Sequence, residues 1–125
     1  MISIEFANRS GRHVDTEPVS AVCRRVLAAE GIEAGDLGVA FVGLEEMRAL
    51  KREHLRIDEP TDVLSFPIDG KEDLPSGLPR QLGDVVICPQ VVGEEWQGSL
   101  VHGLLHLLGY DHGLEMDDRE AVLLR

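Results

Sequence analysis

The sequence contains little cysteine, few aromatic residues and little positive charge. Its 125 residues include two cysteines, Cys23 and Cys88, and both fall in apolar patterns. We therefore expect packed thiols in a reducing compartment, with no disulfide partner. Aromatic residues make up 4% of the chain, which leaves few rings for stacking bases, and a net charge of −11 excludes a protein that coats nucleic acid through bulk positive charge. No segment approaches the roughly 18 apolar residues of a membrane span and the N-terminus has no leader pattern, so we expect a cytoplasmic protein.

The periodicity of apolar residues predicts a single α+β domain that spans residues 1–125. Strand patterns occupy residues 2–8, 37–42, 63–66 and 85–87, and a long loop is expected over 69–82. Helical patterns occupy residues 16–31, with Thr16 as the cap, 44–55, and 89–108, with a break near Gly98 and Ser99. Because strands and helices interleave, we expect a mixed sheet of about four strands packed with helices on at least one face.

Three of the five histidines lie in one segment, HGLLHLLGYDH, as His102, His106 and His112. His102 and His106 are four residues apart, so on a helix their rings project from adjacent turns of one face. Gly109 permits a left-handed turn that ends the helix and lets His112 fold back toward the other two. Three imidazoles that leave a fourth tetrahedral position open are typical of a catalytic zinc site. The segment therefore predicts one zinc ion per chain, with copper and nickel excluded only by availability.

The histidine segment also admits other interpretations. A single histidine on an apolar helix is more often a hydrogen-bonded core residue, but two buried imidazoles without partners would be costly. The spacing equals that of the long zinc-protease signature, in which a glutamate beside the first ligand is the general base. Gly103 occupies that position, which argues against a peptidase. The remaining acidic candidates also have structural explanations, so no catalytic residue is assigned: Asp62 in a turn, Asp84 at a strand start, and Asp111 orienting a ligand imidazole.

A local basic ridge is predicted on the second helix. Arg48, Arg52 and Arg56 follow one another at four-residue steps, and a small basic face can hold a phosphate backbone on an acidic molecule. The alternative is a solvated face, in which these arginines pair with nearby carboxylates: Glu45, Glu46, Glu53 and Asp58. His13 and His54 have no partners at ligand spacing and are expected on the surface.

The histidine segment, together with PTDVLSFP at 60–67 and LGDVVIC at 82–88, resembles the bacterial YbeY-type rRNA maturation factors, which are zinc-dependent single-strand endoribonucleases. The three motifs match in order and approximate separation, over most of the chain. The resemblance implies a cytoplasmic enzyme that cleaves single-stranded RNA. It also implies a role in 16S rRNA 3′-end maturation and ribosome quality control, with the small ribosomal subunit as partner and zinc held by His102, His106 and His112.

The chain departs from the family pattern in three places. The family commonly carries an arginine in a YRG-like turn after the second helix, and an ungapped match puts Leu55 there with Arg56 next to it. Arg56 is the residue expected to bind phosphate, and whether it replaces the family arginine is left open. The segment between LGDVVIC and the histidines is short for the family, and the tail after His112 predicts a final helix of only two turns.

The sequence leaves three functional hypotheses open. The first is metal-assisted cleavage of single-stranded RNA, with either water or the ribose 2′-hydroxyl as the attacking group. The second is a ribosome-assembly binding protein whose zinc organises the fold. The third is a zinc hydrolase of peptides or small molecules, which Gly103 disfavours.

Overall fold

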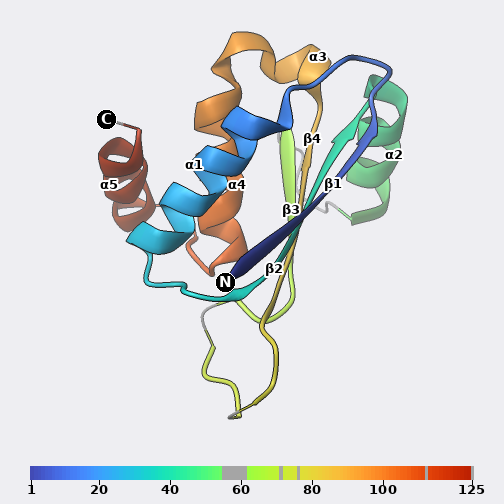
Figure 1. Cartoon of the computed structure of the whole chain (residues 1–125). Coiled ribbons are helices and arrows are strands. Elements are labelled where there is room, and N and C mark those ends of the chain that lie inside the picture. Colours follow the sequence, from blue (N-terminus) through green and yellow to red (C-terminus); the bar gives the residue numbers. More distant parts are fainter. Residues whose placement is uncertain (55–61, 71, 76, 112, 125) are drawn as a thin grey trace.

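The structure is a computed structural model that describes residues 1–54, 62–70, 72–75, 77–111 and 113–124. The strands in this part of the chain are β1 (Ile2–Arg9), β2 (Gly35–Val42), β3 (Val63–Pro67) and β4 (Gln81–Ile87). The helices are α1 (Thr16–Ala29), α2 (Leu44–His54), α3 (Pro89–Val92), the 3₁₀ turn η1 (Gly93–Glu95), α4 (Trp96–Leu107) and α5 (Leu114–Leu123). Figure 1 shows these elements along the chain. The predicted α+β class is confirmed.

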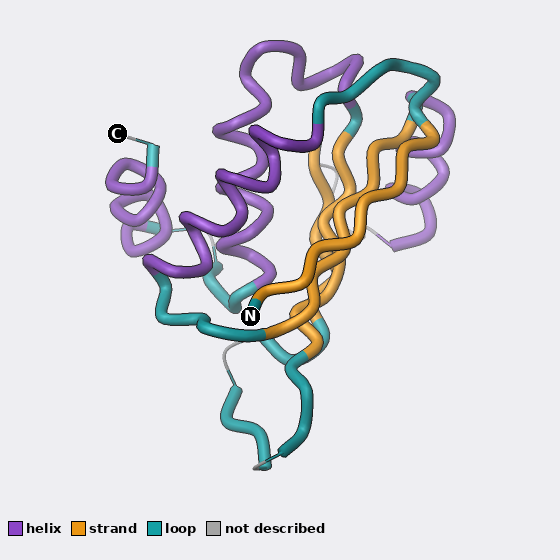
Figure 2. The backbone as a smooth tube through the Cα atoms, in the orientation of Figure 1, coloured by secondary structure: helices purple, strands orange, loops and turns teal. Residues whose placement is uncertain are grey.

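The four strands form one mixed sheet in the order β1-β2-β4-β3 (Figure 2). β1, β2 and β4 run parallel, and β3 runs antiparallel to β4 and forms one edge. β4 lies inside the sheet, which explains its continuous apolar run: Val85, Val86 and Ile87 are all buried. The prediction of a mixed sheet with a short central strand at 85–87 is therefore correct, although the strand begins earlier, at Gln81.

Helices cover both faces of the sheet. α1, α4 and α5 lie on one side and α2 lies on the other (Figure 1). Alternation along β3 assigns its residues to the two layers: Val63 joins the large core cluster with α1 and α4, and Leu64 joins a smaller cluster with Met47 of α2. The edge strand β3 thus has α4 on one face and α2 on the other.

Two predicted helix boundaries are wrong. Asp15, not Thr16, caps α1, and its carboxylate accepts a 3.1 Å hydrogen bond from the backbone N–H of Glu17. The break in 89–108 falls at Gly93, which has a φ of 53°, a left-handed value that an α-helix cannot continue through. Gly98 instead lies inside α4.

Tertiary packing corrects two further predictions. α5 has ten residues, longer than the predicted two turns, because Met116 and Leu123 are buried in the core and hold both of its ends. The apolar pattern of residues 44–55 predicts that Leu44, Met47, Leu50 and Leu55 face the core, but Leu44 is 41% exposed, whereas Met47 is buried. Leu55 lies outside the described residues.

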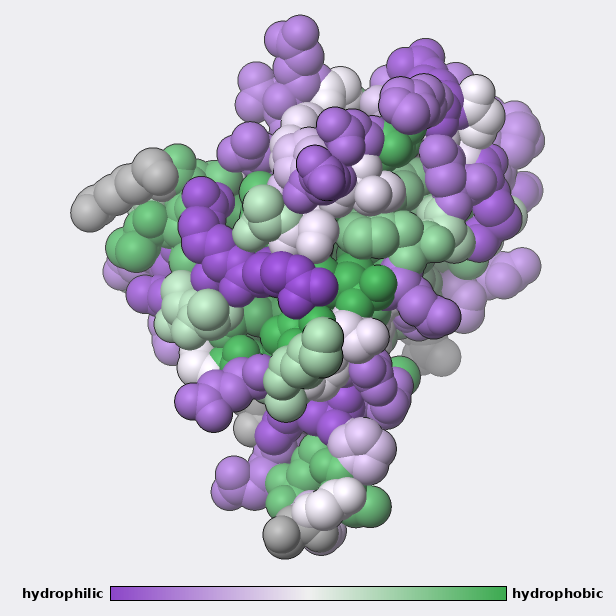
Figure 3. Space-filling model, viewed as in Figure 1, coloured by the Kyte–Doolittle hydropathy of each residue, from purple (hydrophilic) through white to green (hydrophobic). Residues whose placement is uncertain are grey.

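The two cysteines are buried free thiols, as predicted. Burial raises the pKa of Cys23 to about 12, so this thiol stays protonated at neutral pH. In the part of the chain that the structure describes, no helix is long and apolar enough to cross a membrane. Figure 3 shows hydrophilic residues around the margin of this face and apolar residues across its centre and over α5, where Val122 is exposed.

Candidate functional site

α4 carries the histidine pair and is buried on most of its surface. It packs on β3, β4, α1 and α5. Its apolar residues are almost completely inaccessible: Leu100, Val101, Leu104, Leu105 and Leu107. His102 and His106 are half-buried on the remaining face. The apolar core therefore fixes the backbone from which both imidazoles project.

Gly103, between the two histidines, brings α4 into close contact with the sheet. A Cβ atom added at Gly103 would lie 2.8 Å from Cγ2 of Val63 and 3.1 Å from Cγ1 of Val85. Ser65 Oγ donates a 2.6 Å hydrogen bond to the Gly103 carbonyl. A glutamate has no room at this position, so the general base of the zinc peptidases cannot be placed here.

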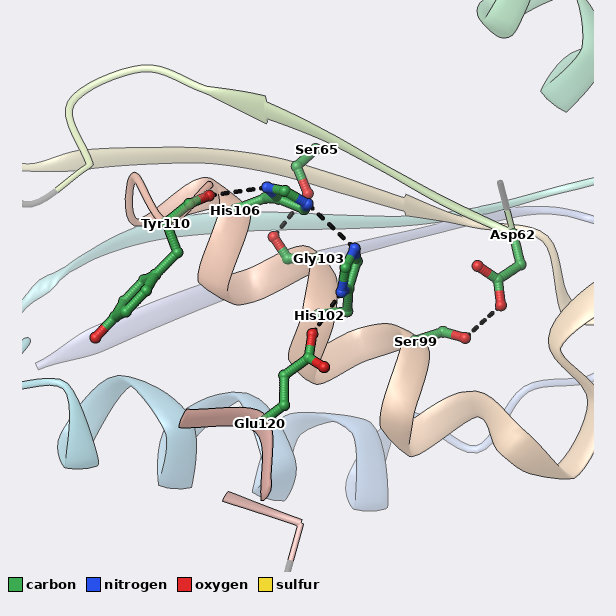
Figure 4. Close-up of polar contacts among 8 residues, drawn as sticks. All are labelled: Asp62, Ser65, Ser99, His102, Gly103, His106, Tyr110 and Glu120. Atoms are coloured by element: carbon green, nitrogen blue, oxygen red, sulfur yellow. Dashed lines mark hydrogen bonds and ion pairs between the residues drawn. The ribbon is translucent and has the colours of Figure 1, made fainter. Parts of the chain in front are cut away.

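The two imidazoles face each other through their Nε2 atoms, which lie 3.1 Å apart. Their ring centroids are 4.6 Å apart and the ring planes meet at 83° (Figure 4). The predicted i,i+4 pairing of His102 and His106 on one helical face is therefore correct.

The Nδ1 atom of each ring contacts an acceptor on the opposite side of the ring. Nδ1 of His102 lies 2.5 Å from Oε1 of Glu120, and Nδ1 of His106 lies 2.9 Å from the carbonyl oxygen of Tyr110 (Figure 4). Carbonyl and carboxylate oxygens accept, so we assign the proton of each neutral ring to Nδ1. Both Nε2 lone pairs then point into one small region. This donor set fits a divalent metal, whose histidine ligands commonly donate their second N–H to such acceptors.

Gly109 places the Tyr110 carbonyl. With a φ of 101°, Gly109 ends α4 in a Schellman motif: its N–H bonds to the His106 carbonyl at 3.0 Å, and the Tyr110 N–H bonds to the Leu105 carbonyl at 3.0 Å. The chain turns back so that the Tyr110 carbonyl meets the His106 ring. The prediction that Gly109 stops the helix is confirmed.

Two predicted site residues, His112 and Arg56, lie outside the described residues. Within the residues that are described, no group of three or more His, Cys, Asp or Glu side chains is arranged to hold a metal ion. The structure thus brings His102 and His106 together. The third predicted ligand stays a prediction.

The three acidic candidates occupy different places. The carboxylate of Asp62 accepts a hydrogen bond from Ser99 Oγ, one turn before His102, and so ties the start of β3 to α4. Asp84 is exposed, and because Val85 faces α4, Asp84 points to the opposite face of the sheet. Asp111 is exposed as well.

Sequence reasoning missed Glu120, the carboxylate that contacts His102. It lies in an acidic tail with three other carboxylates, and composition does not distinguish it from them. Spacing does, because Glu120 is four residues after the buried Met116 and three before the buried Leu123. A carboxylate on the apolar face of a helix is the signal that identifies it.

The described part of the expected basic ridge, Arg48 and Arg52, lies on α2, on the other side of the sheet from the histidines. Arg48 and Arg52 of α2 are exposed, and Arg48 lies 3.5 Å from Glu45, as in the solvated-face interpretation. His54, at the end of α2, makes an edge-on contact with Phe66 of β3, with ring centroids 5.2 Å apart. Only the edge strand β3 therefore separates the end of α2 from the layer of α4. His13 and His54 are exposed, as predicted.

Comparison with known proteins agrees with the fold and the motifs. The family model described as Endoribonuclease YbeY matches residues 4–124. The chain is 38% identical to the endoribonuclease YbeY of Salinispora tropica, over 99% of this chain and 92% of the relative, and 35% identical to that of Nocardia farcinica, over 99% and 77%. A solution structure of a Thermotoga maritima protein superposes with a TM-score of 0.57 at 25% identity, covering 99% of this chain and 87% of that one.

These relatives are hydrolases of one class, enzymes that cut RNA internally. The chain belongs to the endoribonuclease YbeY family. The family resemblance and the enzyme class inferred from the sequence motifs are confirmed.

Proposed function

We propose that this domain, residues 1–125, is a zinc-dependent, single-strand-specific endoribonuclease. We place it in the cytoplasm, in maturation of the 16S rRNA 3′ end and in ribosome quality control on the small subunit. The observation that carries the proposal is the 3.1 Å approach of the two Nε2 atoms while acceptors engage both Nδ1 atoms. Relatives named as endoribonucleases support RNA as the substrate.

His102, His106 and His112 would hold the metal ion. Neutral imidazole nitrogens suit zinc, and three protein ligands leave a position open at a catalytic site. When bound, zinc supplies Lewis-acid chemistry that polarises a phosphoryl oxygen. Glu120 and the Tyr110 carbonyl keep Nδ1 protonated, so that Nε2 of His102 and of His106 is presented as the ligand atom.

The basic residues around α2 supply phosphate contacts in this proposal. Arg56 follows α2 in the sequence and is proposed to bind backbone phosphate beside the metal site. Arg48 and Arg52, exposed on α2, would add phosphate contacts on the other face of the sheet. Because the protein carries a net charge of −11, this local attraction acts against a repulsive background and should weaken with salt.

Metal analysis combined with an RNA cleavage assay tests the proposal. The wild type should bind about one zinc ion per chain and cut single-stranded RNA, and His102→Ala, His106→Ala and His112→Ala should each lower cleavage by about 100-fold or more, beyond the loss typical of outer-shell changes. His13→Ala is the matched control, an exposed histidine outside the segment, and should cleave normally. Unchanged cleavage in the three variants would refute the proposal.

A 2′,3′-cyclic phosphate on the products identifies the ribose hydroxyl as the attacking group, and a simple monophosphate identifies water.

Removal of zinc separates catalysis from a structural role. α4 is already held by a large apolar cluster that joins it to the sheet and α1. We therefore expect the chelated protein to stay folded by circular dichroism but to lose cleavage. Global unfolding on chelation would favour the binding-protein hypothesis instead.

A further inference from the structure

Glu30 is a buried carboxylate where helix physics disfavours one. It is the C-cap of α1, and its side chain is 2% exposed. Gly31, with a φ of 80°, fixes this end in a Schellman motif through bonds from Gly31 N–H to the Ala28 carbonyl and from Ile32 N–H to the Leu27 carbonyl. The C-terminus of a helix carries partial negative charge, so a carboxylate there is repelled as well as desolvated. Such a departure from local preference commonly marks a functional role.

The two oxygens of Glu30 engage two different segments. Tyr110 Oη donates a 2.5 Å hydrogen bond to Oε1. Arg119 donates from Nε to Oε2 at 2.9 Å and forms an ion pair with the same oxygen through Nη2. The hydrogen bonds to Glu30 raise the pKa of the Tyr110 hydroxyl and of the Arg119 guanidinium. Both partners are therefore strongly coupled to this one carboxylate.

Each partner belongs to the segment that provides an acceptor for one histidine. The backbone carbonyl of Tyr110 accepts from His106. Arg119 directly precedes Glu120 on α5, and Glu120 contacts His102.

We propose that Glu30 is a positioning residue whose carboxylate orients both imidazoles at once, through Tyr110 for His106 and through Arg119 and α5 for His102. The consequence for zinc binding rests on the proposed function. The orientation of the two rings is independent of the proposed function, because it is a property of the metal-free protein.

The two branches can be separated by substitution. Tyr110→Phe removes the hydroxyl but keeps the backbone carbonyl, so it should loosen the acceptor of His106 alone. Arg119→Gln removes the ion pair and should loosen the acceptor of His102 alone. Glu30→Gln weakens both branches and should affect both rings. Glu46→Gln is the matched control, because Glu46 pairs with Arg9 on the surface, 2.8 Å away, and lies on α2, across the sheet from both branches.

The test is long-range ¹H–¹⁵N correlation of the imidazoles in the metal-free full chain at alkaline pH, which reports which nitrogen carries the proton. The wild type and Glu46→Gln should show both rings protonated at Nδ1. Glu30→Gln should show mixed tautomers in both rings, and a zinc-selective chelator in competition should report zinc affinity lowered by about 10-fold.

Wild-type tautomers in a folded Glu30→Gln protein would overturn the proposal, whatever its thermal stability. If Glu30→Gln does not fold, Tyr110→Phe and Arg119→Gln provide the test. The proposal is also overturned if each of these variants changes both rings equally, or if neither variant changes a ring. If the tautomers change in Glu30→Gln as expected but the wild type neither binds zinc nor cuts RNA, the proposed function is wrong and the positioning role of Glu30 is retained.

Discussion

The hydroxyl of Ser65 donates a hydrogen bond of 2.6 Å to the carbonyl of Gly103, joining the edge strand β3 to the helix of the histidine pair. The bond requires α4 to lie almost against the sheet, which is possible because residue 103 has no Cβ. The position of the two imidazoles beside the β3 edge is therefore set by a contact on an adjacent face of their helix.

Gly103→Ala should destabilise the protein by about 1–3 kcal/mol, because the new methyl group overlaps Val63 and Val85. Gly98→Ala is the control on the same helix, where an added Cβ meets nothing within 4 Å, and it should stabilise the protein by roughly 0.5–1 kcal/mol. Urea denaturation measures both free energies of unfolding. Stabilisation of the protein by Gly103→Ala, as by Gly98→Ala, would contradict the close packing at Gly103.

Glu120→Gln should lower zinc affinity by about 10-fold, because a neutral amide holds Nδ1–H of His102 more weakly than a carboxylate does. Asp118→Asn is the matched control, since Asp118 is exposed on the same helix and the substitution removes the same charge. Chelator competition measures both affinities. An equal loss in the two variants would mean that Glu120 acts only through its long-range charge.

Gly109→Ala should lower both stability and zinc affinity. A φ of 101° is strained for alanine and costs about 1–2 kcal/mol, and relief of the strain would move the Tyr110 carbonyl away from His106. Gly11→Ala introduces comparable strain at a φ of 78°, with open space around it, and should lower stability alone. If the two variants bind zinc equally well, the turn at Gly109 does not position the site.

The buried thiol of Cys23 should make the free energy of unfolding depend on pH in the alkaline range. Its pKa is raised from 9.0 to about 12 in the folded protein, so between these values the unfolded chain releases a proton that the folded chain retains. The free energy of unfolding therefore falls as pH rises from about 9 toward 12. Cys23→Ala should lack this part of the decrease, and the difference between wild type and variant should be constant below pH 9. Parallel curves throughout would show that Cys23 does not contribute.

The local parts of the site could be predicted from the sequence. The i,i+4 spacing of His102 and His106, the helix stop at Gly109 and the central strand at 85–87 each follow from periodicity or backbone preference over a few residues. The absence of a side chain at Gly103 was read correctly as evidence against a peptidase. The structure adds the steric reason, because Val63 and Val85 fill the space.

The supporting contacts depend on how distant segments pack, and periodicity does not encode that. Glu120 is 18 residues from His102, and Glu30 is 80 residues from Tyr110. The sequence predicts the helix break near Gly98, whereas it falls at Gly93. Both glycines carry the same intrinsic penalty in a helix, so propensity does not distinguish between them. The placement of α2 on the face of the sheet opposite α4 is likewise a result of tertiary packing that no local pattern indicates.

Arg119 and Glu30 are separated by 89 residues, and this distance determines when the site can be assembled. A growing polypeptide can form α1, the sheet and even α4 while the last helix is still missing. At that stage the His102 imidazole has no carboxylate behind it, and Glu30 lacks its guanidinium. We expect the imidazoles of His102 and His106 to reach their final orientation only when α5 packs against α4. A partly synthesised chain would therefore be unable to cut RNA.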